Sequence, residues 1–218
     1  MSVPSTDELK PRHLRITEPS PWVARFAPLV PAGGTVLDVA CGGGRHGRLF
    51  LARGHPVVMI DRDVDAVTDL AEGRARVIEA DLEDGSPFPL AGERFAAVVA
   101  VNYLYRPLLA ALIDAVAPDG LLIYETFARG NERFARPRNP DHLLASGELL
   151  EAVRGRLHVV AYEHGIVENA PLPGVKQRLC AVNAAPSPHR QDGQPEPLVL
   201  PDHPAAPPPR TPRTPDRG

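Results

Sequence analysis

The 218-residue sequence has few cysteines and few aromatic residues: two cysteines, one tryptophan and an aromatic content of 5%. Cys41 and Cys180 are too far apart for the spacing of a metal site and too few for a disulfide framework. No group of His, Cys or acidic residues has the spacing of metal ligands either. We therefore expect no metal centre, and we expect Cys41 to be a small packed residue rather than a reactive thiol.

Long apolar runs and an excess of basic charge are also missing. No run approaches the roughly 18 to 20 apolar residues that cross a bilayer, and residues 1–8 lack the regions of a signal peptide. The net charge is −3, which gives no general electrostatic argument for DNA, RNA or an anionic membrane as a partner. We expect a cytoplasmic protein, and the sequence does not indicate its oligomeric state.

Proline is abundant, and its distribution sets the domain boundaries. Eleven of the 26 prolines lie between positions 186 and 215, among few large apolar residues. Such a segment cannot bury enough surface to offset its ordering entropy. We expect an N-terminal extension at residues 1–18 that is partly ordered at best, one domain at residues 19–184, and a disordered proline-rich tail at residues 185–218.

The chain is organised around residues 36–53. An apolar strand with Asp38 inside it runs directly into Gly42, Gly43 and Gly44, and a helical apolar face follows. Glycine allows a sharp turn and the close approach of a ligand, and the helix N-terminus behind the turn offers unpaired N–H groups. The next strand ends at Asp61, roughly 20 residues after the glycines, where an acid can hold a ribose diol.

Two nucleotide cofactors fit this pattern. Three glycines match the dinucleotide fingerprint, which favours a nicotinamide cofactor: Gly42, Gly44 and Gly47. Asp38 argues against it, because a carboxylate at the loop would repel a pyrophosphate. A third strand ends at Asp81, and acids at three strand ends suit a cationic nucleoside such as S-adenosylmethionine. The nicotinamide alternative remains open on the residues alone.

In this order and spacing, the motifs at residues 36–44, 61 and 79–82 resemble those of class I S-adenosylmethionine-dependent methyltransferases, over about residues 19–184. Residues 44–46 resemble the small-molecule and tellurite-resistance branch. The family usually has glycine where Ala40 stands, so we expect a slightly altered loop. The resemblance implies that residues 38–44 hold the methionine part, Asp61 the ribose, and Asp81 with Leu82 the adenine. The cofactor-binding residues implied are Asp38, Ala40, Gly42, Gly44, Asp61, Arg62, Asp81, Leu82 and Asn102.

Alternating strands and helices predict an α/β fold with a doubly wound, mostly parallel sheet. We expect strands at residues 36–39, 56–60, 75–80, 95–101 and 121–124, helices at 20–30, 48–53, 63–72, 107–116 and 146–153, and no long helix at 83–92. A turn-rich link makes the last pair, at 157–163 and 175–182, antiparallel. This agrees with the seven-stranded sheet that the resemblance implies, with a reversed last strand and the order 3-2-1-4-5-7-6.

Candidates for catalysis and substrate binding follow the later strands. The catalytic candidates are Asn102, Tyr103, Arg106 and Glu125, and no catalytic residue is required for direct displacement at a sulfonium. Glu125 either pairs with Arg106, which we favour, or accepts a proton. The long loop at 128–142 suggests a lid. The substrate-binding candidates are Tyr105, Arg106, Phe134 and His142.

Besides the nicotinamide alternative, three functions remain. The favoured hypothesis is methyl transfer from S-adenosylmethionine to a small molecule by direct displacement. The alternatives are methylation of RNA or protein, and a non-catalytic module that binds a cofactor or partner. The helix near residue 22 either covers the sheet, which we favour, or closes over the cofactor through Trp22 or Arg25.

Overall fold

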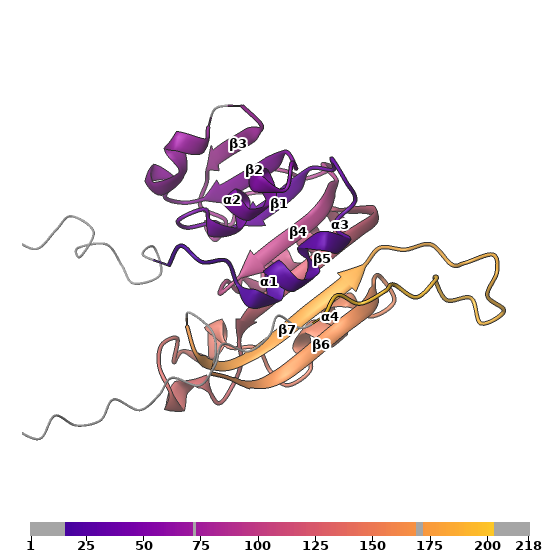
Figure 1. The fold of residues 1–218 in the computed structure, drawn as a ribbon. Coiled ribbons are helices and arrows are strands. Elements are labelled where there is room, and N and C mark those ends of the chain that lie inside the picture. The colour runs from indigo at the N-terminus through magenta and orange to yellow at the C-terminus, as the bar shows by residue number, and fades with distance from the viewer. Residues whose placement is uncertain (1–15, 72, 169–171, 203–218) are drawn as a thin grey trace, which may run out of the picture.

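The computed structural model describes residues 16–71, 73–168 and 172–202 (Figure 1). Within these residues, seven strands form one sheet in the order β3-β2-β1-β4-β5-β7-β6. Strands β1 to β5 run parallel to one another, and β7 runs antiparallel to both β5 and β6, which confirms the predicted sheet. The strands are β1 (Val36–Val39), β2 (Val57–Asp61), β3 (Ala75–Glu79), β4 (Phe95–Val101), β5 (Val116–Phe127), β6 (His158–Val167) and β7 (Gly174–Val182).

Helices cover both faces of this sheet. On one face, α1 and α2 pack with one hydrophobic cluster, and on the other α3 and α4 pack with a second. Successive residues of a strand alternate between the two clusters, as in Leu37 and Val36, because side chains in a strand point to opposite faces. The helices are α1 (Pro21–Phe26), α2 (Arg45–Ala52), α3 (Arg106–Asp114) and α4 (Glu148–Val153), with short 3-10 turns η2 (Ala27–Leu29), η3 (Asp65–Leu70), η4 (Asn131–Arg133) and η5 (Pro140–His142).

Helix α1 begins as its sequence predicts. The Ser20 hydroxyl accepts a hydrogen bond from the Trp22 N–H at 3.2 Å, and Pro21 occupies the first turn. Trp22 and Phe26 are buried with their rings 4.7 Å apart, and the Trp22 indole donates to the Leu179 carbonyl at 3.2 Å. Trp22 therefore covers the sheet, as we favoured.

The helix expected at residues 63–72 is shorter than predicted. Only the 3-10 turn η3 forms there, and residue 72 lies outside the described residues. Asp61 accepts a hydrogen bond from the Asp63 N–H, and Asp63 accepts one from the Asp65 N–H, both at 3.1 Å. Such local bonds from aspartate side chains compete with helical hydrogen bonds. The helix therefore begins two residues later than predicted, at Asp65, and has the narrower 3-10 form.

The C-terminal elements are confirmed with longer strands. The hairpin of β6 and β7 extends to Val167 and Gly174, and residues 80–94 contain no helix. Residues 183–202 form neither helix nor strand, and the Pro201 carbonyl accepts a hydrogen bond from Arg25 at 3.2 Å. The domain boundaries at 18 and 185 stay predictions, because residues 1–15 and 203–218 lie outside the described residues.

Candidate active site

The glycine turn connects β1 to α2 through left-handed backbone conformations. Gly42 has φ of +52° and Gly44 has φ of +72°. A Cβ on Gly44 would lie 2.5 Å from a methyl carbon of Val67, so only glycine allows this packing. Ala40 has φ of +50°, which non-glycine residues rarely adopt, and this accounts for the glycine usual at that position in the resembled family.

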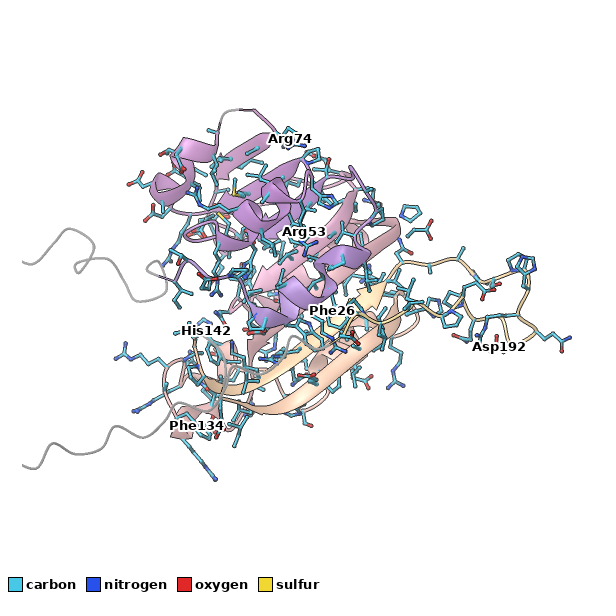
Figure 2. The ribbon with its side chains drawn as sticks, viewed as in Figure 1. Phe26, Arg53, Arg74, Phe134, His142 and Asp192 are labelled. Atoms are coloured by element: carbon cyan, nitrogen blue, oxygen red, sulfur yellow. The ribbon has the colours of Figure 1, made fainter. Side chains whose placement is uncertain are left out.

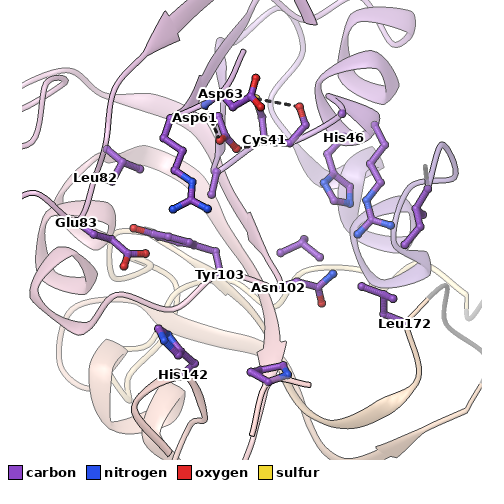
Figure 3. Close-up of a pocket in the computed structure, with 18 of the residues that line it drawn as sticks. Cys41, His46, Asp61, Asp63, Leu82, Glu83, Asn102, Tyr103, His142 and Leu172 are labelled. Carbon is purple, nitrogen blue, oxygen red and sulfur yellow. Dashed lines mark hydrogen bonds between the residues drawn. The ribbon is translucent and has the colours of Figure 1, made fainter. Parts of the chain in front are cut away.

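Asp61 ties the end of β2 to this turn. Its Oδ2 atom accepts a hydrogen bond from the Gly42 N–H at 2.8 Å, and its Oδ1 atom accepts the one from Asp63. A carboxylate has about four acceptor positions, so these two bonds leave Asp61 able to accept more. Its side chain lines a pocket above the turn (Figure 3).

Asp38 and His46 lie against the turn and stabilise it. Asp38 is 1% exposed, its Oδ2 atom accepts a hydrogen bond from the Gly47 N–H at 2.9 Å, and burial raises its pKa to about 7. His46 is 3% exposed, and burial lowers its pKa to about 3. The His46 Nε2 atom accepts a hydrogen bond from the Ser20 N–H at 3.2 Å, so the neutral ring carries its proton on Nδ1, 3.8 Å from Asp38.

The pocket has a volume of about 870 Å³ and lies at the carboxyl ends of β1 to β4, where open α/β sheets bind ligands. A second cavity of about 300 Å³ shares its wall at Asn102, Tyr103, Phe127 and neighbouring residues. The predicted site residues that line the larger pocket are Ala40, Gly42, Asp61, Arg62, Asp81, Leu82, Asn102, Tyr103 and His142. Those that do not line it are Asp38, Gly44, Tyr105, Arg106, Glu125 and Phe134.

Tyr103 lines this pocket and carries a polar atom that lacks a hydrogen-bond partner within the described residues. Its hydroxyl is buried and has no hydrogen-bond partner within the described residues. Burial raises the pKa of Tyr103, so the hydroxyl stays protonated and can donate or accept. Buried polar atoms are normally paired, so this hydroxyl has hydrogen-bonding capacity that the described residues do not use.

Glu125 does not pair with Arg106, and that prediction was wrong. Glu125 is 1% exposed, and its Oε1 atom lies 2.5 Å from the Lys176 ammonium. Its Oε2 atom accepts a hydrogen bond from the Ser20 hydroxyl at 2.7 Å and lies 3.4 Å from Arg178. Burial raises the pKa of Glu125, but Lys176 and Arg178 outweigh burial and the pKa is lowered overall. The carboxyl group is therefore ionised and is a poor proton acceptor.

Arg106 instead joins two helices and a loop. Its guanidinium binds both carboxylate oxygens of Glu148, at 2.6 and 3.0 Å, and donates to the carbonyls of Asp141 and Leu143. All five guanidinium N–H groups point along a rigid fork, so these partners leave Arg106 little capacity for a substrate. Tyr105 precedes α3 and lines neither cavity.

The loop at residues 128–142 contributes to the pocket through its second half. Arg136, Pro137 and His142 line it, whereas Phe134 is 52% exposed and lies at the outer edge of the loop (Figure 2). Asn131 is fully buried and fixes the loop: its amide donates to the Pro137 carbonyl at 3.1 Å, and its carbonyl oxygen accepts from the Val175 N–H at 3.2 Å.

Sequence reasoning missed several residues of the site. The pocket is also lined by Arg45, His46 and Glu83, which lie beside predicted residues. Each of them is next to a predicted motif in the sequence, and this position could have identified them as site residues. Lys176 had no such signal, because it lies on β7, far along the chain from the residues that it contacts.

No protein-family model and no curated protein matches the sequence. Solved structures do match it. TehB from Haemophilus influenzae is similar with a TM-score of 0.59 and 16% identity, over 74% of this chain but only 61% of that one. A TehB-like S-adenosylmethionine-dependent methyltransferase from Corynebacterium glutamicum is similar with a TM-score of 0.53 and 20% identity, over 75% of this chain and 87% of that one.

A third structure contains ligands. The 1,6-didemethyltoxoflavin-N1-methyltransferase from Burkholderia thailandensis, solved with 1,6-didemethyltoxoflavin and S-adenosylhomocysteine, is similar with a TM-score of 0.55 and 19% identity, over 75% of this chain and 76% of that one. The chain has the class I methyltransferase fold. The reversed strand β7 and the sheet order are those that the sequence motifs implied.

The pocket of this methyltransferase fold is chemically suited to S-adenosylmethionine. It combines a glycine turn with four acids near strand ends, Asp61, Asp63, Asp81 and Glu83. These acids outnumber the three arginines that also line the pocket, and they suit a ligand with an ammonium and a sulfonium. Within residues 16–71, 73–168 and 172–202, no group of side chains is arranged to hold a metal ion, and no helix has the length and apolarity to cross a bilayer.

Proposed function

We propose that this chain is an S-adenosylmethionine-dependent methyltransferase that acts on a small-molecule acceptor. The observation that carries the proposal is the Asp61–Gly42 hydrogen bond, which joins the acidic end of β2 to the glycine turn at the wall of the pocket. A carboxylate held in this way can accept hydrogen bonds from two vicinal hydroxyls of a ribose.

The remaining cofactor contacts follow the pocket wall. We propose that Ala40 and Gly42 lie against the methionine part, that Asp81 and Leu82 contact the adenine, and that Arg62 and Asn102 line the space between them and the acceptor. Asp38 and Gly44 support the turn from behind. When bound, S-adenosylmethionine supplies an electrophilic methyl group whose transfer leaves the bonding electron pair on sulfur.

The work left to the chain is positioning. Direct displacement needs approach in line with the breaking bond and exclusion of water, and these follow from a shaped pocket rather than from an acid or base. Pro137 and His142 line the pocket, and Asn131 bonds their loop to β7, which supports a role of this loop in excluding water. A nucleophilic nitrogen, oxygen or sulfur on the acceptor suffices.

Pocket size supports a small acceptor. The volume of about 870 Å³ is in the range of small-molecule sites, and the adjoining cavity of about 300 Å³ offers separate room for an acceptor. The Burkholderia thailandensis structure holds a small molecule together with S-adenosylhomocysteine. This parallel supports the proposal at the level of fold.

The first experiment is calorimetric titration of the protein with S-adenosylhomocysteine, with NADH as the control. We expect S-adenosylhomocysteine to bind and NADH not to bind. Labelled S-adenosylmethionine is then incubated with small-molecule, RNA and protein pools, and label is expected in the small-molecule fraction. Binding of NADH alone, or label only in RNA or protein, would contradict the proposal.

A further inference from the structure

A buried lysine lies next to two residues of the pocket wall. Lys176 on β7 is 2% exposed and lines neither cavity. Its Nζ atom lies 2.5 Å from Glu125 Oε1, 3.0 Å from Asn102 Oδ1 and 4.9 Å from the centre of the Phe127 ring. Asn102 and Phe127 both line the two cavities, so Lys176 contacts the site through them.

The charge of Lys176 determines how the Asn102 carboxamide is oriented. An ammonium group only donates hydrogen bonds, so the amide atom that faces it is the oxygen and not the nitrogen. The backbone of Asn102 is also fixed, with φ of +58° and an N–H that donates to the Glu125 carbonyl at 2.7 Å. The Asn102 Nδ2 group is consequently turned away from Lys176.

This amide N–H₂ group is available to a ligand. Within the described residues no protein atom accepts a hydrogen bond from Asn102 Nδ2, and Asn102 lines both cavities. Figure 3 shows its side chain in the wall of the larger one. A donor at this point selects a ligand that carries an acceptor. Arginines offset the acids of the larger pocket, but the smaller cavity is lined by Glu83 and, among the described residues, by no arginine or lysine, so a neutral acceptor is favoured there over an anionic one.

We propose that Lys176 is a positioning residue that fixes the Asn102 carboxamide with its N–H₂ group toward the pocket, and that the methyl acceptor presents a neutral hydrogen-bond acceptor there, a carbonyl oxygen or an unprotonated ring nitrogen. The aromatic rings of Tyr103 and Phe127 line the same cavity and favour a flat ring. The identification of this ligand as the methyl acceptor rests on the proposed function, whereas the orientation of Asn102 does not.

The test compares two flat six-membered rings that are both neutral at pH 7, 4-pyridone, which carries a carbonyl oxygen, and aniline, which carries an amino group in its place. Both are titrated calorimetrically, with and without S-adenosylhomocysteine. We expect 4-pyridone to bind about fivefold more tightly, which corresponds to one neutral hydrogen bond. In the Lys176→Met/Glu125→Gln variant, which removes both buried charges, the preference is expected to fall close to one.

Two further variants separate positioning from folding. Lys176→Arg keeps a cation that only donates and is expected to retain the preference. Arg178→Met removes the other cation of Glu125 from the same strand without touching Asn102, and is also expected to retain it. Thermal unfolding of each variant verifies that it is folded.

The outcomes are distinguishable. Equal binding of the probes, tighter binding of aniline, binding of neither, or a preference that persists in the double variant would each overturn the inference. Failure of S-adenosylhomocysteine to bind would overturn the proposed function alone, since the probe comparison without it is still read out.

Discussion

The two halves of the sheet hold their acidic strand ends in different ways. At the end of β2, Asp61 accepts hydrogen bonds from two backbone N–H groups and lines the pocket. At the end of β5, Glu125 is buried and its oxygens are occupied by Lys176, Ser20 and Arg178. A carboxylate held by backbone amides keeps acceptor positions for a ligand, whereas one neutralised by cations does not.

This difference separates carboxylates that can bind a ligand from carboxylates that stabilise the fold. In the β1–β3 half, carboxylates at the pocket are arranged to meet a ligand. In the β4–β5–β7 half, the charges of Glu125, Lys176 and Arg178 satisfy one another away from the pocket, and Lys176 contacts the pocket wall through Asn102. Substitutions in the first half should change affinity, and substitutions in the second should change stability.

The largest expected effect is on stability, at Lys176. Lys176→Met leaves Glu125 buried with an incomplete set of partners, and breaking a buried ion pair from one side costs about 3–5 kcal/mol. The Lys176→Met/Glu125→Gln variant removes both charges and should recover most of that loss. Urea unfolding measures both. If the single variant is as stable as the wild type, the ion pair is not the support that we describe.

The second prediction concerns Asp38 and His46, whose shifted pKa values act in opposite directions. The pKa of Asp38 rises from 3.8 to about 7 on folding, so its contribution to stability is present at low pH and is lost as pH rises from about 4 to 7. The pKa of His46 falls from 6.5 to about 3, so its contribution is present above pH 6.5 and is lost as pH falls toward 3. Between about pH 4 and 6.5 the two slopes oppose each other.

Single substitutions should expose each slope. Asp38→Asn leaves His46 alone, and its stability is expected to rise with pH by up to about 1.4 kcal/mol per unit between pH 4 and 6.5. His46→Gln should show the reverse slope, a fall in stability as pH rises. Urea unfolding at several pH values measures both. If the free energy of unfolding depends on pH in the same way in the wild type and in both variants, Asp38 and His46 do not contribute opposite slopes.

The third prediction concerns ligand affinity at Asp61. Asp61→Ala removes the hydrogen bonds of a charged acceptor, worth roughly 1.5–3 kcal/mol each, so the affinity for S-adenosylhomocysteine should fall about tenfold or more. Calorimetric titration measures the change. Asp65→Ala is the matched control, because Asp65 is an exposed acid outside the pocket wall and removes the same charge. Equal affinity in both variants would remove Asp61 from the site.

The sequence predicted the parts of this site that are local in the chain. The glycine turn and the acids near strand ends are read from adjacent residues, and parallel strands bring those ends to one edge. The strand order, including reversed β7, followed from the family resemblance. These features depend on the backbone and its hydrogen-bonding pattern more than on any individual side-chain pairing.

The side-chain pairs could not be predicted in this way. Lys176 and Asn102 are 74 positions apart, and Lys176 and Glu125 are 51 apart. They meet only because β7 runs antiparallel to β5 in a register that places Lys176 opposite Phe127. A shift of one residue would turn Lys176 to the other face of the sheet. The hydrophobic pattern does not reveal which cation meets a given acid.

The smallest expected effect is at Arg106, where the sequence-based prediction of its partner was wrong. The sequence placed Arg106 with Glu125 or with a substrate, but it binds Glu148 and two loop carbonyls instead. Its side chain is 38% exposed and that of Glu148 is 21% exposed, so solvent weakens the pair, and Arg106→Ala should cost about 1 kcal/mol of stability. Affinity for S-adenosylhomocysteine should stay within about twofold of the wild type. Such a change corresponds to less free energy than one hydrogen bond contributes.

The control is Arg156→Ala, which removes an arginine that pairs with Asp114 of the same helix, α3. A selective loss of affinity in Arg106→Ala would show that the second half of the sheet also binds ligand directly.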